Sequence, residues 1–129
     1  MTKRNLKRVM LAMALVLGMA FVWGQSGKGI LTVTNCPEEA MALICVNSDP
    51  KTMMELLGAL SKYVAAGTIS NSSSELISTA GENFNSTGKF LVIVLVDSDV
   101  YFIGNVSFTN GCATIDFKSM TAQLSLPVS

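Results

Sequence analysis

The sequence contains no histidine, so it lacks the side chain that serves most often as a general base and as a zinc ligand. Without histidine, neither a Ser-His-Asp triad nor a Cys-His pair can be built. Its two arginines, Arg4 and Arg8, both lie near the start, so no guanidinium remains further along to hold a phosphate. Glycine-rich phosphate loops and dinucleotide-binding fingerprints are also missing. These absences predict that the protein is not an enzyme, and we assign no catalytic, cofactor-binding or metal-ligating residue.

Charge is missing from the 15 residues 9–23, which follow a basic start made of Lys3, Arg4, Lys7 and Arg8. A positive segment before a short apolar run is typical of a secretory signal peptide. The run is shorter than the roughly 20 residues that a membrane-spanning helix needs. We therefore predict that residues 1–24 are a signal peptide cut between Gly24 and Gln25, with Ala20 as a weaker alternative to Gly24.

Cleavage would leave residues 25–129 as a single exported domain in the periplasm, on the cell surface or outside the cell. It would have no transmembrane anchor, and no lipid anchor because the first cysteine, Cys36, lies well beyond the apolar run. Five lysines then face nine acidic residues, which gives a net charge of −4. Without arginine or a basic patch, we expect no binding to nucleic acid or to anionic membranes.

Alternating and apolar runs predict several strands. Residues 29–35 alternate apolar and threonine side chains, which indicates a half-buried strand. After a turn at 36–39, residues 40–46 are expected to complete a first hairpin. The β-branched run at 90–96 is typical of a central strand buried on both faces. Residues 121–126 are expected to add an edge strand that ends at Pro127.

Asn110-Gly111 is the strongest hairpin signal, because both central residues of a type I′ turn need positive φ. It joins the predicted strands 100–109 and 112–118. A two-residue loop would pair Thr109 with Cys112 and Val106 with Ile115. This register places apolar and polar side chains on opposite faces, as expected for a well-specified strand pair.

One helix is expected near 51–65, where six apolar side chains recur at helical spacing. They are Met53, Leu56, Leu57, Leu60, Tyr63 and Val64. Its start is either Asp49 followed by Pro50, or a capping box of Thr52 and Glu55, and Gly67 would end it. The polar stretch 68–89 indicates loops around a short strand at Leu76-Ile77.

The predicted fold class is therefore α+β and mainly β. We expect an antiparallel sheet, sandwich or barrel-like, of about five to seven strands with the one helix near 51–65. An all-β sandwich is the alternative.

Three stretches carry a further pattern: GILTVTNCP at 29–37, FNSTGKFLVIV at 84–94 and NVSFTNGCATIDF at 105–117. Together they resemble a family of small exported β-rich proteins of treponemes and related spirochaetes, for which no activity is established. The shared motifs mark turns and strands rather than chemistry. The resemblance therefore implies export and a β-rich fold, and no catalytic residue is carried over from it.

Carboxylate and thiol side chains remain as candidates for catalytic, metal-binding or disulfide roles. Asp97, Asp99 and Asp116 are candidates for an acid–base pair, but polar turn and solvated strand positions explain them more simply. Asp97-Ser98-Asp99 also offers oxygen ligands for Ca²⁺, in a loop that lacks the other ligands needed. Of the three cysteines, Cys45 is expected to be a buried thiol, whereas Cys36 and Cys112 either form a disulfide or form no bridge.

These features favour a non-catalytic exported module that binds a protein or envelope partner. The alternative is a carrier for a small apolar ligand held in a barrel-like cavity. A hydrolase that uses carboxylates alone is the third hypothesis.

Overall fold

The computed structural model describes residues 28–37 and 39–128. The predicted signal peptide, 1–24, and its cleavage site between Gly24 and Gln25 lie outside the described residues. In the part of the chain that is described, no helix has the length and apolar character needed to cross a membrane.

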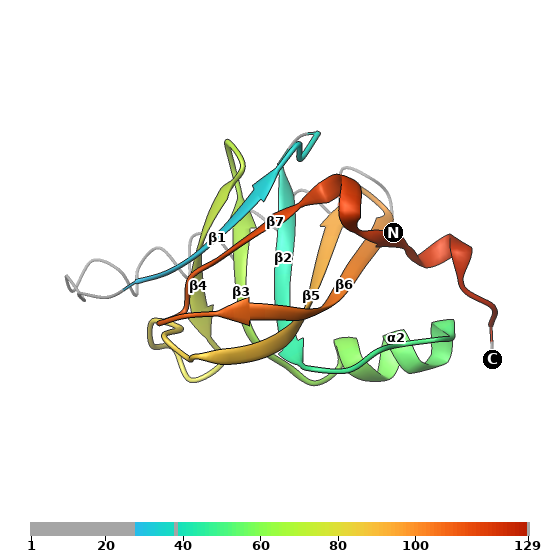
Figure 1. Ribbon diagram of the computed structural model, residues 1–129, viewed down its shortest axis with the longest axis horizontal. Coiled ribbons are helices and arrows are strands. Elements are labelled where there is room, and N and C mark those ends of the chain that lie inside the picture. The colour runs from blue at the N-terminus through green and yellow to red at the C-terminus, as the bar shows by residue number, and fades with distance from the viewer. Residues whose placement is uncertain (1–27, 38, 129) are drawn as a thin grey trace.

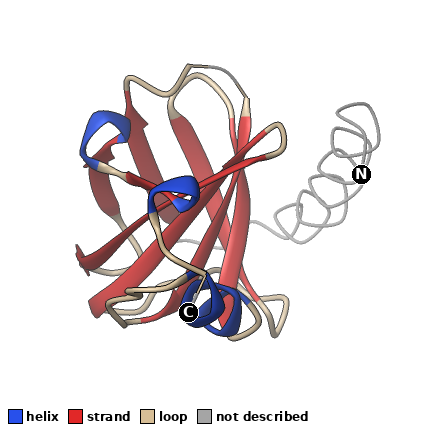
Figure 2. Cartoon of the chain, turned by 90° about the vertical axis from the view of Figure 1, so that its right-hand side faces the viewer, coloured by secondary structure: helices blue, strands red, loops and turns tan. Residues whose placement is uncertain are grey.

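The described residues form a mainly β fold with one helix, α2, and one curled sheet of eight strands (Figures 1 and 2). The strands are β1 (Gly29–Thr34), β2 (Ala40–Val46), β3 (Tyr63–Ile69), β4 (Ser73–Ser78), β5 (Gly88–Val96), β6 (Asp99–Phe108), β7 (Ala113–Asp116) and β8 (Thr121–Ala122). Their order is β7-β1-β4-β3-β2-β5-β6-β8. The mainly β prediction with one helix is confirmed, but the sheet has eight strands rather than about five to seven.

The sheet is mixed rather than purely antiparallel, because β7 runs parallel to β1. Leu31 lies opposite Ala113, and Thr34 lies opposite Asp116. β1 pairs on its other side with β4, not with β2, so the predicted first hairpin is wrong. β2 instead lies between β3 and β5. The sequence pattern identified both strands, but strand partners depend on tertiary packing.

The curled sheet buries apolar side chains on two sides. Its inner face collects side chains from β1 to β7, whereas the outer core lies beneath α2. β2 and β5 contribute to both: Ile44 and Val92 point inward, and Cys45 and Ile93 point outward. This alternation confirms that residues 90–96 form a strand buried on both faces.

Three phenylalanines pack in the inner core. Phe84, Phe90 and Phe108 meet edge to face, with ring centroids 5.3–5.5 Å apart in each pair. This geometry matches the arrangement that the ring quadrupoles prefer. Side chains therefore occupy this part of the interior.

A β-bulge in β6 changes which side chains face inward. The register with β5 shifts between Phe90 and Val92, and Asn105 takes a φ of 57°. One extra residue reverses the alternation, so Phe102 joins the outer core whereas Val106 and Phe108 join the inner one.

Helix α2 spans Met53–Leu60, so it is shorter than the predicted 51–65. Thr52 is its N-cap, and its Oγ1 accepts a hydrogen bond from Glu55 N at 3.1 Å, as the capping-box alternative predicts. Tyr63 and Val64 belong to β3 instead, which pairs with β2. Gly67 does not end the helix: it lies inside β3, where an added Cβ would overlap Ser74 Oγ and Glu75 O of β4.

The Asn110-Gly111 turn is confirmed, with φ values of 52° and 77°. Thr109 and Cys112 form the expected bridge, with N···O distances of 2.9 and 3.0 Å. Beyond this bridge, β6 and β7 do not pair, because β7 continues along β1. The predicted faces are nevertheless correct: Val106 and Ile115 are buried, and Ser107 and Thr114 are exposed.

The polar stretch 68–89 contains more regular structure than loops around a two-residue strand. Residues 68–69 end β3, residues 73–78 form β4, and residues 88–89 begin β5. Asn71 and Ser72, with φ of 53° and 64°, make the tight turn between β3 and β4. At the other end of the chain, the predicted strand 121–126 shortens to β8, and a 3-10 turn follows at Gln123–Ser125.

Candidate functional site

The stretch FNSTG at 84–88 contacts the Asn110-Gly111 turn at one end of the sheet. Ser86 O accepts a hydrogen bond from Gly111 N at 2.8 Å, and Thr87 Oγ1 accepts one from Asn110 N at 3.0 Å. The Phe84 carbonyl lies so close to Gly29 and Gly111 that a Cβ on either would overlap it. The motifs thus hold loop 84–87 against the hairpin turn, and their role here is structural.

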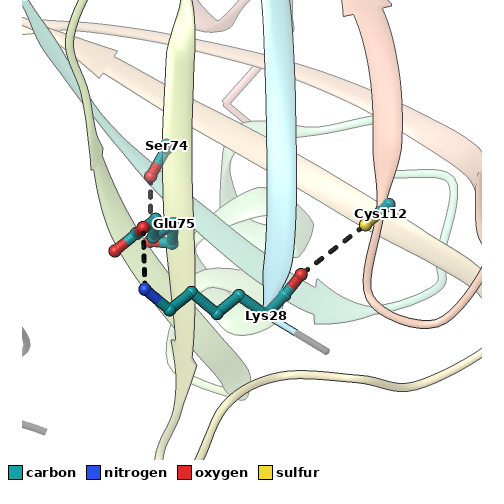
Figure 3. Close-up of polar contacts among 4 residues, drawn as sticks. All are labelled: Lys28, Ser74, Glu75 and Cys112. Atoms are coloured by element: carbon teal, nitrogen blue, oxygen red, sulfur yellow. Dashed lines mark hydrogen bonds and ion pairs between the residues drawn. The ribbon is translucent and has the colours of Figure 1, made fainter. Parts of the chain in front are cut away.

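Lys28 connects the start of β1 to both neighbouring strands (Figure 3). The Cys112 thiol lies 3.7 Å from the Lys28 carbonyl, to which it donates a weak hydrogen bond. On the other side, Lys28 Nζ lies 3.5 Å from Glu75 Oε1 of β4. Ser74 Oγ donates to the Glu75 carbonyl at 3.2 Å. Because the Lys28–Glu75 pair is partly exposed, we expect its contribution to stability to be small.

The predicted Cys36–Cys112 disulfide does not fit this arrangement. Cys112 contacts Lys28 at the start of β1, whereas Cys36 follows the end of that strand. The six residues of β1 span about 20 Å, and a disulfide needs Cα atoms within about 7 Å. Cys45 is a fully buried free thiol, as predicted, and burial raises its pKa from 9.0 to about 11.

The candidate carboxylates are not brought together. Asp97 lies in the turn between β5 and β6, and Asp99 begins β6. Asp116 instead lies near residues 103–107, roughly 16 Å along β6 from Asp99, which is too far for an acid–base pair. Hydrogen bonds from Asn35 Nδ2 and Lys118 N, each 3.0 Å long, lower the pKa of Asp116. Across residues 28–37 and 39–128, no three Cys, Asp or Glu side chains gather as metal ligands would.

A groove opens where β6 and β7 separate beyond the Thr109–Cys112 bridge. It has a volume of about 360 Å³ and is lined by residues 103–107 of β6, 114–116 of β7, and Ser119. Tyr101 and Phe117, with ring centroids 4.6 Å apart, lie beyond its other end. The lining of the groove combines aliphatic side chains with hydroxyl groups and the Asp116 carboxylate.

A larger cleft, of about 470 Å³, separates residues 46–50 from the exposed side of α2. The helix side is formed by Glu55, Gly58, Ala59 and Lys62. Charged groups lie around its rim, where Lys51 Nζ pairs with Asp49 Oδ2 at 2.9 Å and Glu55 Oε2 accepts Lys51 N at 2.9 Å. The cleft thus combines aliphatic surface with charges of both signs.

Residues 47–48, on the side of the cleft that faces α2, are hydrogen-bonded to the bulge of β6. Asn47 Oδ1 accepts a hydrogen bond from Asn105 N at 2.9 Å, and Asn47 Nδ2 donates to Asn105 Oδ1 at 2.8 Å. The Ser48 carbonyl lies directly over Gly104, where a Cβ would come within 2.7 Å of it. This reciprocal amide pair positions residues 47–48 independently of the helix.

Most of the exposed large apolar side chains lie on α2, on the strand ends next to it or on the C-terminal segment. Among the described residues, six of the seven large hydrophobic side chains that are exposed belong to α2, the adjoining strand ends or the C-terminal segment. The six are Val46, Met54, Leu57, Tyr63, Leu124 and Val128, and the seventh is Ile30 of β1. Met54 and Val128 are more than 60 % exposed, although Met54 N lies only 3.3 Å from Val128 O. We call these six residues, together with the cleft, the α2 surface.

The sequence did not single out the α2 surface, because its residues come from a strand end, a loop, a helix and a distant segment. One signal was present: MMELLGAL is apolar on almost every side, whereas a helix that only covers a core is apolar on one stripe. No family model, no curated protein and no solved structure matches the chain, so its resemblance to exported spirochaete proteins stays a prediction.

Proposed function

We propose that the protein is an exported, non-catalytic binding module that contacts a protein or envelope partner through the α2 surface. The observation that carries this proposal is that α2 and the segments next to it hold most of the exposed large apolar side chains of the described residues. Soluble monomers seldom expose apolar groups together without an interaction to cover them. Export rests on the predicted signal peptide, and the non-catalytic role rests on the missing histidine and on the separated carboxylates.

The chemistry of the α2 surface matches that of a transient protein interface. Such interfaces have an apolar centre and a polar rim. Met54 and Leu57 supply exposed aliphatic groups one helical turn apart, and Asp49, Lys51 and Lys62 lie around the cleft. The occupant that fits best is therefore a protein surface with its own aliphatic centre and charges of both signs.

A carrier of a small apolar ligand has less support. A barrel-like carrier needs vacant space inside the sheet. Here the edge-to-face contacts of Phe84, Phe90 and Phe108 occupy the inner core. A carboxylate-only hydrolase likewise lacks a pair of carboxylates at catalytic spacing.

The test is capture of partners from envelope extract of the source cell by the purified exported domain. A Met54→Lys/Leu57→Lys double variant should lose a partner that the unchanged protein retains, because two charges would be buried at the contact. Ile30→Lys is the matched control, since Ile30 is an exposed apolar residue of β1 that lies outside the α2 surface. Equal recovery by the double variant, or turnover of a glycoside or ester by the purified protein, would refute the proposal.

A further inference from the structure

Helix α2 and the C-terminal segment 123–128 are joined by main-chain hydrogen bonds. Met53 N donates to Pro127 O at 2.8 Å, and Met54 N donates to Val128 O at 3.3 Å. These N–H groups belong to the first turn of the helix, where no carbonyl of the helix itself can accept them. The segment therefore supplies acceptors that the helix needs, and Figure 2 shows it running across the end of α2.

The same segment is fastened to the sheet at its other end. β8 pairs with Tyr101 and Phe102 of β6, and Leu126 packs against the outer core. Leu124, between these two attachments, is 84 % exposed. Leu126 is thus the side chain that anchors the segment on the apolar face beneath α2.

Few side chains of helix α2 pack against the sheet. Leu56 is its only fully buried side chain in the described structure, while Ala59 and Leu60 are partly buried. The face that it covers is mainly apolar and includes Met41, Leu43 and Cys45 of β2. A two-turn helix with one buried anchor is only marginally stable without further support.

We propose that α2 is a lid over the outer face of β2 and β5, and that segment 123–128 is the latch that keeps it closed. The lid opens while the strands stay paired, because the strand ladders and the inner core do not involve α2. The Asn47–Asn105 amide pair fixes the chain as far as Ser48 and Pro50 is buried, which places the hinges at residues 51–52 and 61–62. This inference does not depend on the binding function proposed above.

Cys45 reports on the state of the lid, because it lies on the covered face with no solvent exposure. In the closed state, burial shields the thiol and also disfavours the thiolate, which is the reactive form. Opening removes both forms of protection at once. Cys112 is exposed beside Lys28 at the start of β1, away from α2. Its alkylation rate therefore serves as a reference within the same molecule.

The experiment is alkylation of the folded protein with iodoacetamide, in which the thiolate displaces iodide, followed by peptide mass spectrometry of each cysteine. In Leu126→Ala, Cys45 should react about tenfold faster than in the unchanged protein, because the latch loses most of its apolar contact. Leu124→Ala is the matched control and should leave the Cys45 rate unchanged. The Cys112 rate should stay the same in all three proteins.

An unchanged Cys45 rate in Leu126→Ala would overturn the proposal. If that variant fails to fold, the unchanged protein decides the question through the urea dependence of Cys45 alkylation below the unfolding transition. Opening of the lid alone exposes little surface and gives a shallow dependence. A dependence as steep as that of global unfolding at every urea concentration would show that no lid opens separately.

Discussion

Replacing Gly111 by alanine tests the contact between the hairpin turn and loop 84–87. The substitution has two separate costs. Gly111 has a φ of 77°, a conformation that costs an L-residue about 1–2 kcal/mol. Its new Cβ would also overlap the Phe84 carbonyl and lie 2.9 Å from Asn85 Cα, and overpacking of this kind costs about 1–3 kcal/mol. We expect Gly111→Ala to lower the free energy of unfolding by about 2–5 kcal/mol in total.

Two other glycines separate these costs. Gly81 has a φ of 86° with no atom near the position of a Cβ, so Gly81→Ala should carry the conformational cost alone, about 1–2 kcal/mol. Gly58 lies inside α2 and is equally open, so Gly58→Ala should stabilise the protein by about 0.5–1 kcal/mol.

Urea unfolding followed by far-ultraviolet circular dichroism measures all three variants. With a slope of about 1–3 kcal/mol per molar urea, a loss of 3 kcal/mol lowers the midpoint by about 1–3 M. The order of stability should be Gly58→Ala, unchanged protein, Gly81→Ala and then Gly111→Ala. If Gly111→Ala is no less stable than Gly81→Ala, the packing of Phe84 against the turn does not contribute as we reason.

Two further predictions concern the outer core. Leu56→Ala should lower the free energy of unfolding by about 2–5 kcal/mol in urea titrations, whereas Leu57→Ala should change it by less than about 1 kcal/mol because Leu57 is half exposed. Because burial raises the pKa of Cys45 in the folded protein, its thiol contributes full stability below pH 9.0. This contribution is lost as pH rises from 9.0 through about 11, because only the thiol of the unfolded chain ionises in that window. Urea titrations across this range should show a decline of up to about 3 kcal/mol beyond that of Cys45→Ala, and parallel declines would contradict it.

Alternation along the strands was predictable, because side-chain direction in a strand depends on local geometry alone. The buried and exposed positions of β6 and β7 near the turn follow the sequence pattern, and so do both faces of β5. The partner of each strand was not predictable in the same way. The Asn110-Gly111 signal predicts that β7 pairs with β6, whereas the structure pairs β7 with β1 beyond the Thr109–Cys112 bridge.

The helix boundary and the α2 surface show a second limit. Tyr63 and Val64 fit both a helical stripe and a strand, and pairing with β2 decides for the strand. A glycine after a helical stripe suggests a helix end at Gly67. Its actual role is to let β4 approach β3 closely, which the residues near Gly67 in the sequence cannot reveal. The cleft beside α2 needs the Asn47–Asn105 pair, whose members lie 58 positions apart in the sequence.

The parallel pairing of β7 with β1 also bears on the order of folding. Thr34 and Asp116 are neighbours in the sheet but lie 82 positions apart, so β1 stays without its outer neighbour until residue 116 has been synthesised. Contacts between such distant segments carry a large loop-closure entropy and slow the search for the native state. The β7-β1 edge of the sheet therefore cannot be completed early in translation, and the apolar side chains of β1 wait for a partner until the last part of the chain is made.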